Sequence, residues 1–405
     1  MKRISLDKAI KLILFMYILS IYLFTYREGL FVVSNGIALM FIIAVFVKIL
    51  AFKSVIVFNR FLLYQVFFIF ICVASYFYAV KPNNAITDVR TLALIFIVMF
   101  TIVNYIDTKE RLFWAVKSFI VSGFIASIYI IAVSDFTVVV RYGSELGNTN
   151  AVGLMIGISL IFSINEYYRE KKRRYLIAVL PMFIVIILTG SRKSLLFVII
   201  AALFISYCRD NGSLKNKIKF LLISTIMLSL VYYLVMEVPI FYQVLGKRIE
   251  SMIALFIGEG KVDRSTATRQ YMIEAGIDLF KQRPFFGYGA QNYQVMFGML
   301  TGMDRYSHNN FIELLVNVGI IGTFSYYLTN LRIVKDLLKF FKEYKNKDLI
   351  YAFIAVIFAY FLLGTALVYY DSKHFSFLLA IASVIPNVYY KEAKNENEYK
   401  LDLGE

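Results

Sequence analysis

Long apolar runs separated by short polar breaks make up most of the sequence. Clear examples are Leu12 to Phe24, Phe61 to Val80 and Ile218 to Met236. A helix needs about 20 mainly apolar residues to cross a bilayer, and these runs approach that length. The pattern therefore predicts an all-α, polytopic membrane protein.

The polar breaks divide the apolar sequence into about twelve predicted membrane helices. These cover residues 9–25, 30–51, 61–80, 89–105, 113–133, 150–167, 175–189, 193–208, 218–236, 309–329, 349–369 and 374–390. The ninth and tenth helices are separated by a connection of about seventy residues, whereas the other connections are short. That long connection is the main place where a polar domain can fold.

Lysine and arginine concentrate in alternate connections. Examples are residues 48–60, 109–117, 169–174, 209–219 and 332–347. By the positive-inside rule these connections face the cytoplasm, and both basic termini join them. The long connection then lies on the opposite, extracytoplasmic or periplasmic, side of the cell membrane.

This topology divides the chain into four parts. They are membrane helices 1 to 9 over residues 1–236, the extracytoplasmic loop over residues 237–308, membrane helices 10 to 12 over residues 309–390 and a cytoplasmic tail over residues 391–405. The formal net charge of +16 would also fit a nucleic-acid partner. Because the basic residues flank apolar spans, we interpret them as orientation signals and expect no nucleic acid. Cys72 and Cys208 fall on different predicted helices, so neither a disulfide framework nor a metal site follows.

Spacing within the long loop predicts a short interfacial helix, which Ser265 or Thr266 would cap. Its residues recur at intervals of three and four along one face. That face comprises Arg269, Met272, Gly276, Leu279 and Phe280. Three interpretations of Arg269 stay open: its side chain is solvated, it contacts lipid phosphate, or it belongs to a functional site.

The sequence PFFGYG predicts a chain reversal after this helix. Pro284 disfavours helical geometry at Arg283, and Gly287 and Gly289 permit a tight turn. A second short apolar piece, Tyr293 to Met299, follows the turn. The loop is therefore expected to have its own small architecture.

Polar residues gather where the next apolar helix begins. His308 follows Ser307 at this point, and an imidazole with an ordinary pKa of about 6.5 can accept or donate a proton at physiological pH. The plainer interpretation is a histidine that satisfies local backbone groups. Glu313 lies one turn further on, where a carboxylate facing lipid would be costly, so it should pair or face water.

Arg192 lies in TGSRKS, a tight connection on the same predicted outer side. Arg192, Arg269 and His308 are therefore expected to converge. Guanidinium groups hold phosphate oxygens through paired, charge-assisted hydrogen bonds, and an imidazole beside them can activate a hydroxyl. The combination predicts transfer of a group from a lipid diphosphate.

Several motifs together resemble the superfamily of O-antigen ligases and O-antigen or capsule polymerases, bacterial membrane glycosyltransferases with a GT-C-like architecture. The motifs, within residues 147–330, are GNTN, TGSRKS, TATRQ, PFFGYG and SHNNFIELLVNVGIIG. The resemblance implies that Arg192 and Arg269 bind an undecaprenyl-diphosphate donor and that His308 activates the acceptor hydroxyl. It also implies catalysis without a metal ion or another cofactor, and the outer loops contain no Asp-x-Asp pair.

Further residues near these motifs are candidates for substrate binding. They are Asn148, Asn150, Tyr288, Gln291, Tyr293, Asn309 and Glu313. Helix capping explains the asparagines of GNTN equally well, and anchoring at the membrane interface explains the tyrosines. His374, beside Asp371, is expected to make a local polar contact at a helix start.

Four functions fit the sequence. The leading interpretation is a polysaccharide repeat-unit polymerase, which transfers glycan from an undecaprenyl-diphosphate donor to the sugar of another lipid-linked repeat unit outside the membrane. A ligase would instead deliver finished glycan to a lipid, wall or protein acceptor. A lipid-linked sugar transporter would place its polar groups near the bilayer midplane, and a scaffold would tolerate loss of the arginines. The resemblance implies a flippase and a chain-length regulator as partners.

Overall fold

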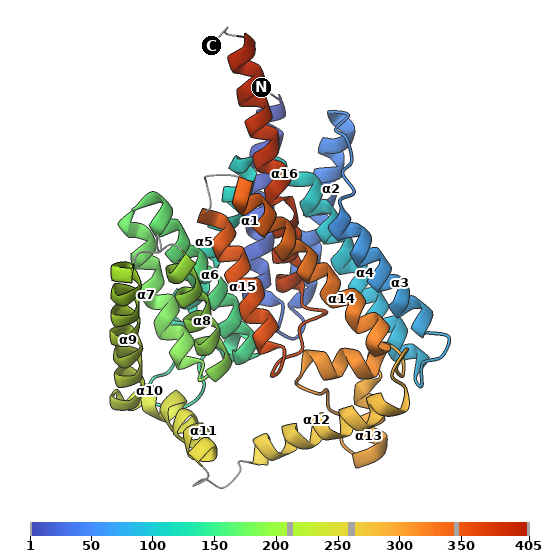
Figure 1. The fold of residues 1–405 in the computed structure, drawn as a ribbon, viewed down its shortest axis with the longest axis vertical. Coiled ribbons are helices and arrows are strands. Elements are labelled where there is room, and N and C mark those ends of the chain that lie inside the picture. The colour runs from blue at the N-terminus through green and yellow to red at the C-terminus, as the bar shows by residue number, and fades with distance from the viewer. Residues whose placement is uncertain (1, 209–213, 258–263, 344–347, 403–405) are drawn as a thin grey trace. The chain divides into compact units, whose positions relative to one another are not determined.

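The computed structural model describes residues 2–208, 214–257, 264–343 and 348–402 (Figure 1). Over these ranges the chain forms helices and no strands, which confirms the all-α prediction there. The elements are α1 (Lys2–Phe24), α2 (Phe31–Ala51), α3 (Arg60–Ser75), α4 (Pro82–Tyr105), α5 (Lys109–Val133), the 3-10 turn η1 (Ser144–Leu146), α6 (Thr149–Glu170), α7 (Arg173–Leu188), α8 (Arg192–Cys208), α9 (Leu214–Glu237), α10 (Pro239–Phe241), the π-helical turn η2 (Tyr242–Gly246), α11 (Lys247–Ile257), α12 (Arg264–Gln282), α13 (Tyr293–Thr301), α14 (Asn310–Glu343), α15 (Asp348–Leu363) and α16 (Lys373–Asp402).

Each of the twelve predicted ranges overlaps one of these helices. Among the described residues, six helices are long and apolar enough to cross a membrane, judged by length and composition. They are α2, α4, α5, α6, most of α9 and most of α14. The chain is therefore a polytopic membrane protein, and the number of twelve spans stays a prediction.

The helices divide into two compact units. Unit 1 contains residues 1–44, 113–261 and 346–360, and unit 2 contains residues 45–112, 262–345 and 361–405. In unit 1, α6 packs against α7 and α8. The Tyr22 hydroxyl of α1 reaches α6, where it donates to the Met155 carbonyl at 3.0 Å and lies 2.7 Å from Ser159 Oγ.

Unit 2 is organised around α14, which packs against α3, α12 and α16. Helix α14 is not continuous, because Gly319 has φ 64° and ψ −170°, a conformation outside the helical region that essentially only glycine adopts. The break separates two donor and acceptor pairs that a regular helix would join, Val316 with Ile320 and Asn317 with Ile321.

The PFFGYG segment supplies the missing partners at this break. The Tyr288 and Gly289 N–H groups donate to the carbonyls of Val316 and Asn317, each at 2.8 Å. The Ile320 and Ile321 N–H groups donate to the carbonyls of Pro284 and Phe285 at 2.8 and 3.4 Å, respectively. In a bilayer, where water cannot replace a lost hydrogen bond, this exchange makes the broken apolar helix possible.

The α3–α4 connection holds the other side of the same segment. The Val80 N–H donates to the Tyr288 carbonyl at 3.1 Å, and the Ala290 N–H donates to Ser75 Oγ at 2.9 Å. The Lys81 N–H donates to Asn292 Oδ1 at 2.7 Å. The segment between α12 and α13 is thus fixed between α3 and α14.

Substitution of Gly319 tests the importance of the break. A Cβ atom there would lie 2.2 Å from the Phe285 carbonyl oxygen, so Gly319→Ala should cost more than the about 1–3 kcal/mol of backbone strain alone. Gly302 is a matched control, because it also has a positive φ, 73°, but a Cβ there would meet nothing within 4 Å. We expect a clearly larger fall in the detergent unfolding midpoint for Gly319→Ala, and equal falls would contradict the proposed role of the break.

Candidate active site

Asn309 caps α14 and thereby fixes the SHNN segment. Its Oδ1 accepts hydrogen bonds from the N–H groups of Phe311 and Ile312, at 3.0 and 3.1 Å, as an N-cap side chain does. The Glu313 carboxylate accepts a hydrogen bond from the Ser307 N–H at 2.7 Å. Glu313 is buried and paired with this N–H group, one of the two arrangements expected for it, and it holds the segment that precedes the cap.

Asn310 joins the same helix start to the connection between α15 and α16. Its Oδ1 accepts hydrogen bonds from the Tyr369 and Tyr370 N–H groups at 2.9 and 3.0 Å, and its Nδ2 donates to the Tyr327 hydroxyl at 2.8 Å. Its own N–H donates to the Gly364 carbonyl at 2.7 Å. The SHNN segment is therefore anchored on both sides of His308.

His308 itself has a left-handed backbone conformation, with φ 56°. Such a conformation is uncommon for a residue other than glycine and persists where the surrounding structure enforces it. The side chain is half-buried, and its ring centroid lies 4.1 Å from that of Tyr306. The backbone of His308 is thus held at the start of a helix, where N–H groups favour negative charge, and its ring packs beside Tyr306.

Arg269 of α12 lies in the electrostatic neighbourhood of the same aromatic ring. Burial raises the pKa of Tyr306 above its usual range, the positive charge of Arg269 opposes this shift, and the Glu313 charge adds to it. Met272 and Leu279 are buried on the face of α12 that the spacing predicted. The charges of Arg269 and Glu313 therefore both act on Tyr306, whose ring also contacts that of His308.

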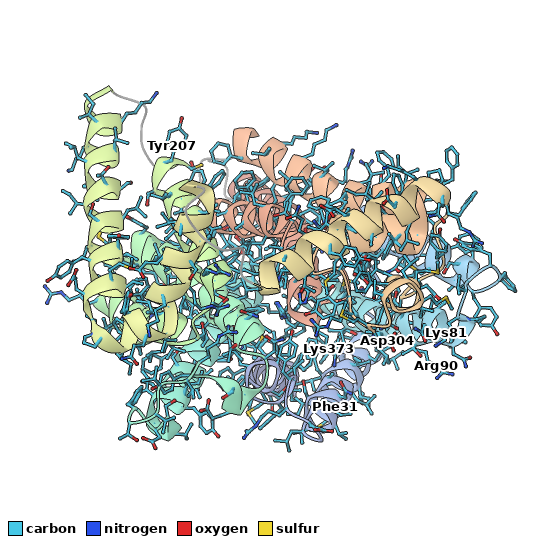
Figure 2. All side chains as sticks on the ribbon, turned by 90° about the horizontal axis from the view of Figure 1, so that it is seen from below. Phe31, Lys81, Arg90, Tyr207, Asp304 and Lys373 are labelled. Carbon is cyan, nitrogen blue, oxygen red and sulfur yellow. The ribbon has the colours of Figure 1, made fainter. Side chains whose placement is uncertain are left out.

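Sequence reasoning missed Tyr306. The only signal was an aromatic residue immediately before SHNN, which is common at a membrane interface. The caps expected at Ser265 or Thr266 lie outside the side chains that the structure describes. Figure 2 shows the side chains from below, with labels on Asp304, in the α13–α14 connection, and on Lys81, at the start of α4.

The candidate sugar-binding tyrosines have structural contacts. Tyr293 is fully buried, and its hydroxyl donates to the Met272 carbonyl at 2.6 Å. The Tyr288 hydroxyl donates to Gln282 Oε1 at 3.2 Å. Gln291 has a left-handed backbone, with φ 54°, in the turn before α13. These contacts link the turn to α12, and sugar binding by the three residues stays a prediction.

In unit 1, arginine side chains surround the TGSR turn. Arg192 Nη1 donates to the Arg248 carbonyl at 2.9 Å, and Arg248 Nη1 donates to the Gly190 carbonyl at 2.5 Å. Arg141 donates to the Thr189 carbonyl and to Asn150 Oδ1, each at 2.8 Å. Three half-buried guanidinium groups thus gather at one turn, an arrangement suited to binding an oxyanion.

The asparagines of GNTN have distinct positions at this turn. Asn148 caps α6, since its Oδ1 accepts hydrogen bonds from the N–H groups of Asn150 and Ala151. Asn150 instead binds Arg141. Sequence reasoning singled out Arg192 but missed Arg141 and Arg248, which lie outside the motifs. The convergence of Arg192 with Arg269 and His308 stays a prediction.

Over the described ranges, the fold and the site define an all-helical membrane protein with a histidine at the start of a broken apolar helix. Residues 177–327 match the model of the O-antigen ligase family. No curated protein sequence matches the chain. The resemblance to the O-antigen ligase and polymerase superfamily is therefore confirmed, and at family level it supports glycan transfer of the ligase or polymerase type. No group of three or more His, Cys, Asp or Glu side chains in the described ranges could hold a metal ion, and metal independence stays a prediction.

Replacement of Asn309 tests whether its helix cap stabilises the protein. Serine caps helices about as well as asparagine, whereas alanine loses about 1 kcal/mol. Asn309→Ala should therefore lower the unfolding midpoint in detergent, and Asn309→Ser should retain most of it. Unchanged midpoints in both variants would show that the cap contributes nothing to stability.

Proposed function

We propose that the protein is a polysaccharide repeat-unit polymerase. It transfers glycan from an undecaprenyl-diphosphate donor to the sugar of another lipid-linked repeat unit on the outer face of the cell membrane. The observation that supports the proposal is that the His308 ring contacts Tyr306, on which the charge of Arg269 also acts, within a region that matches the O-antigen ligase family.

The proposed reaction joins two sugars and releases the lipid diphosphate. An acceptor hydroxyl gives its proton to a ring nitrogen of His308 as its oxygen bonds to the anomeric carbon of the donor. The bond between that carbon and the diphosphate oxygen breaks, and its electron pair leaves with undecaprenyl diphosphate. The guanidinium groups of Arg269 and Arg192 stabilise the charge that develops on the leaving oxygen.

The other residues act on the geometry of these groups. Glu313 and Asn309 orient the segment that carries His308, through the Ser307 N–H and the helix cap. Arg141 and Arg248 extend the guanidinium surface around Arg192. The alternation of basic connections supports an outer location for these residues and cytoplasmic termini.

A ligase is the second candidate function, because the matched family model carries that description. The same histidine and arginines would serve a ligase, since the donor and leaving group are shared. The two functions differ in the acceptor, which is a lipid core, wall polymer or protein for a ligase.

Replacement of His308 tests the proposed base directly. Purified protein in liposomes, supplied with its native lipid-linked repeat units alone, should form a ladder of glycans on a gel. His308→Ala should slow elongation by about 100-fold or more, the usual contribution of a general base. His374→Gln is the matched control, because His374 is the other histidine and contacts Ser372 at 3.0 Å.

Normal elongation by folded His308→Ala protein would contradict the assignment of the base. A single transfer that requires an added lipid-core or wall acceptor would identify a ligase. Neither product from wild-type protein would contradict both proposed functions.

Lysine substitutions test the role of the two arginines. Lysine keeps the positive charge but loses the planar pair of N–H groups. Arg269→Lys and Arg192→Lys should therefore each raise the apparent KM for the lipid-diphosphate substrate. Arg90→Lys, at an exposed position on α4, is the control. Unaltered kinetics in both test variants would rule out paired hydrogen bonding to the diphosphate.

A further inference from the structure

An apolar groove opens on the surface of unit 1 between α1, α5 and α7. Its volume is about 630 Å³, within the range of small-molecule sites. Much of the lining is aliphatic or aromatic and includes Leu12, Phe15, Trp114, Val121, Phe124 and Ile177. Leu12 and Ile177 are 57% and 68% exposed, so the groove presents hydrocarbon surface to its surroundings.

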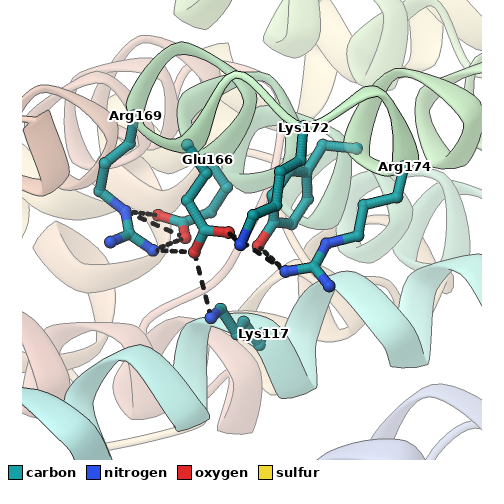
Figure 3. A network of polar contacts seen from close by, with 7 residues as sticks. Lys117, Glu166, Arg169, Lys172 and Arg174 are labelled. Carbon is teal, nitrogen blue, oxygen red and sulfur yellow. Dashed lines mark hydrogen bonds and ion pairs between the residues drawn. The ribbon is translucent and has the colours of Figure 1, made fainter.

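Two cations, Lys117 of α5 and Arg174 of α7, line the same groove. Glu170 holds them together, with Lys117 Nζ 3.1 Å from one carboxylate oxygen and Arg174 Nη2 3.1 Å from the other (Figure 3). Lys172 Nζ lies 2.8 Å from the same carboxylate. The groove therefore has an apolar body and a cationic end.

Positive charge exceeds negative charge at this end. The neighbouring carboxylate, Glu166, is fully buried and accepts hydrogen bonds from Arg169 at 3.0 and 3.1 Å. The second carboxylate, Glu170, is shared among four cations, Lys117, Arg169, Lys172 and Arg174. The side chains of Lys117 and Arg174 are 40% and 60% exposed, and an ammonium and a guanidinium have three and five N–H donors. Both cations thus have donors beyond those that one carboxylate can use.

We propose that this groove binds an anionic glycerophospholipid of the membrane. An acyl chain occupies the apolar groove, and the lipid phosphate accepts hydrogen bonds from Lys117 and Arg174. Basic pockets between membrane helices on the cytoplasmic side favour anionic head groups, and the positive-inside rule predicts that side for residues 109–117 and 169–174. A zwitterionic lipid would bring its own cation to the same place and bind less well.

The chain contains a natural reporter for this site. Trp114 is its single tryptophan, it is 39% exposed, and it lines the groove. Its indole N–H donates to the Lys11 carbonyl at 2.8 Å, which fixes the ring at the groove. Bromine atoms on a lipid acyl chain quench a tryptophan that they contact, so Trp114 fluorescence reports the lipid in the groove.

The experiment uses the full-length protein in phosphatidylcholine liposomes that contain a small, equal fraction of brominated phosphatidylglycerol or brominated phosphatidylcholine. Wild-type protein should be quenched more strongly by the brominated phosphatidylglycerol. In the double variant Lys117→Gln, Arg174→Gln, brominated phosphatidylglycerol should quench Trp114 only as much as brominated phosphatidylcholine does. Lys117→Arg should retain the difference, because it keeps the charge.

Lys53→Gln with Lys335→Gln is the matched control, since it removes two exposed cations of the predicted cytoplasmic side that do not line the groove. Its Trp114 fluorescence should be quenched by each brominated lipid as strongly as that of wild type. Equal quenching of wild type by both brominated lipids, or an equal loss of selectivity in the control pair, would overturn the proposal. If the double variant does not fold, single Lys117→Gln protein should show a partial loss, and full selectivity in that variant would overturn it.

Discussion

The break in α14 at Gly319 is the constraint on which unit 2 depends. An apolar helix in a bilayer cannot leave backbone groups without partners, and a glycine in this conformation interrupts two consecutive helical hydrogen bonds. The PFFGYG segment restores them with two N–H donors and two carbonyl acceptors. The segment and the break therefore require each other, and Gly287 and Gly319 provide the close approach between them.

This exchange positions the candidate site. Helix α12 precedes the inserted segment and α13 follows it, so both are fixed against α14 by the same hydrogen bonds. Gly276 lets α12 approach Ile312 near the start of α14. Arg269 on α12 and His308 before α14 consequently share one neighbourhood around Tyr306. The backbone arrangement thus places polar side chains of α12 and of the SHNN segment near Tyr306, at the end of an apolar helix, and their action on one substrate stays a prediction.

Much of this architecture follows from the sequence, and the rest follows from contacts that no local pattern records. Apolar length predicts the helices, and the spacing of Met272, Gly276 and Leu279 predicts the buried face of α12. The turn at Gly287 follows from proline and glycine chemistry. The break at Gly319 does not, because NVGIIG has the composition of an ordinary apolar helix. Arg141 and Arg248 were missed for a similar reason, because their partners Thr189 and Gly190 are distant in sequence. Tyr306 was missed because an aromatic residue at a membrane interface has an ordinary explanation as an anchor.

We propose that Arg269, Tyr306 and His308 hold the reacting end of a lipid-diphosphate donor. Photo-crosslinking tests this proposal, with a lipid-linked repeat unit that carries a diazirine on the sugar next to the diphosphate. Mass spectrometry of the labelled peptides locates the contact. We expect label on residues 306–310 and on α12, and excess unlabelled donor should reduce it. Label that excess donor removes but that lies only outside these two segments would contradict donor binding by Arg269, Tyr306 and His308.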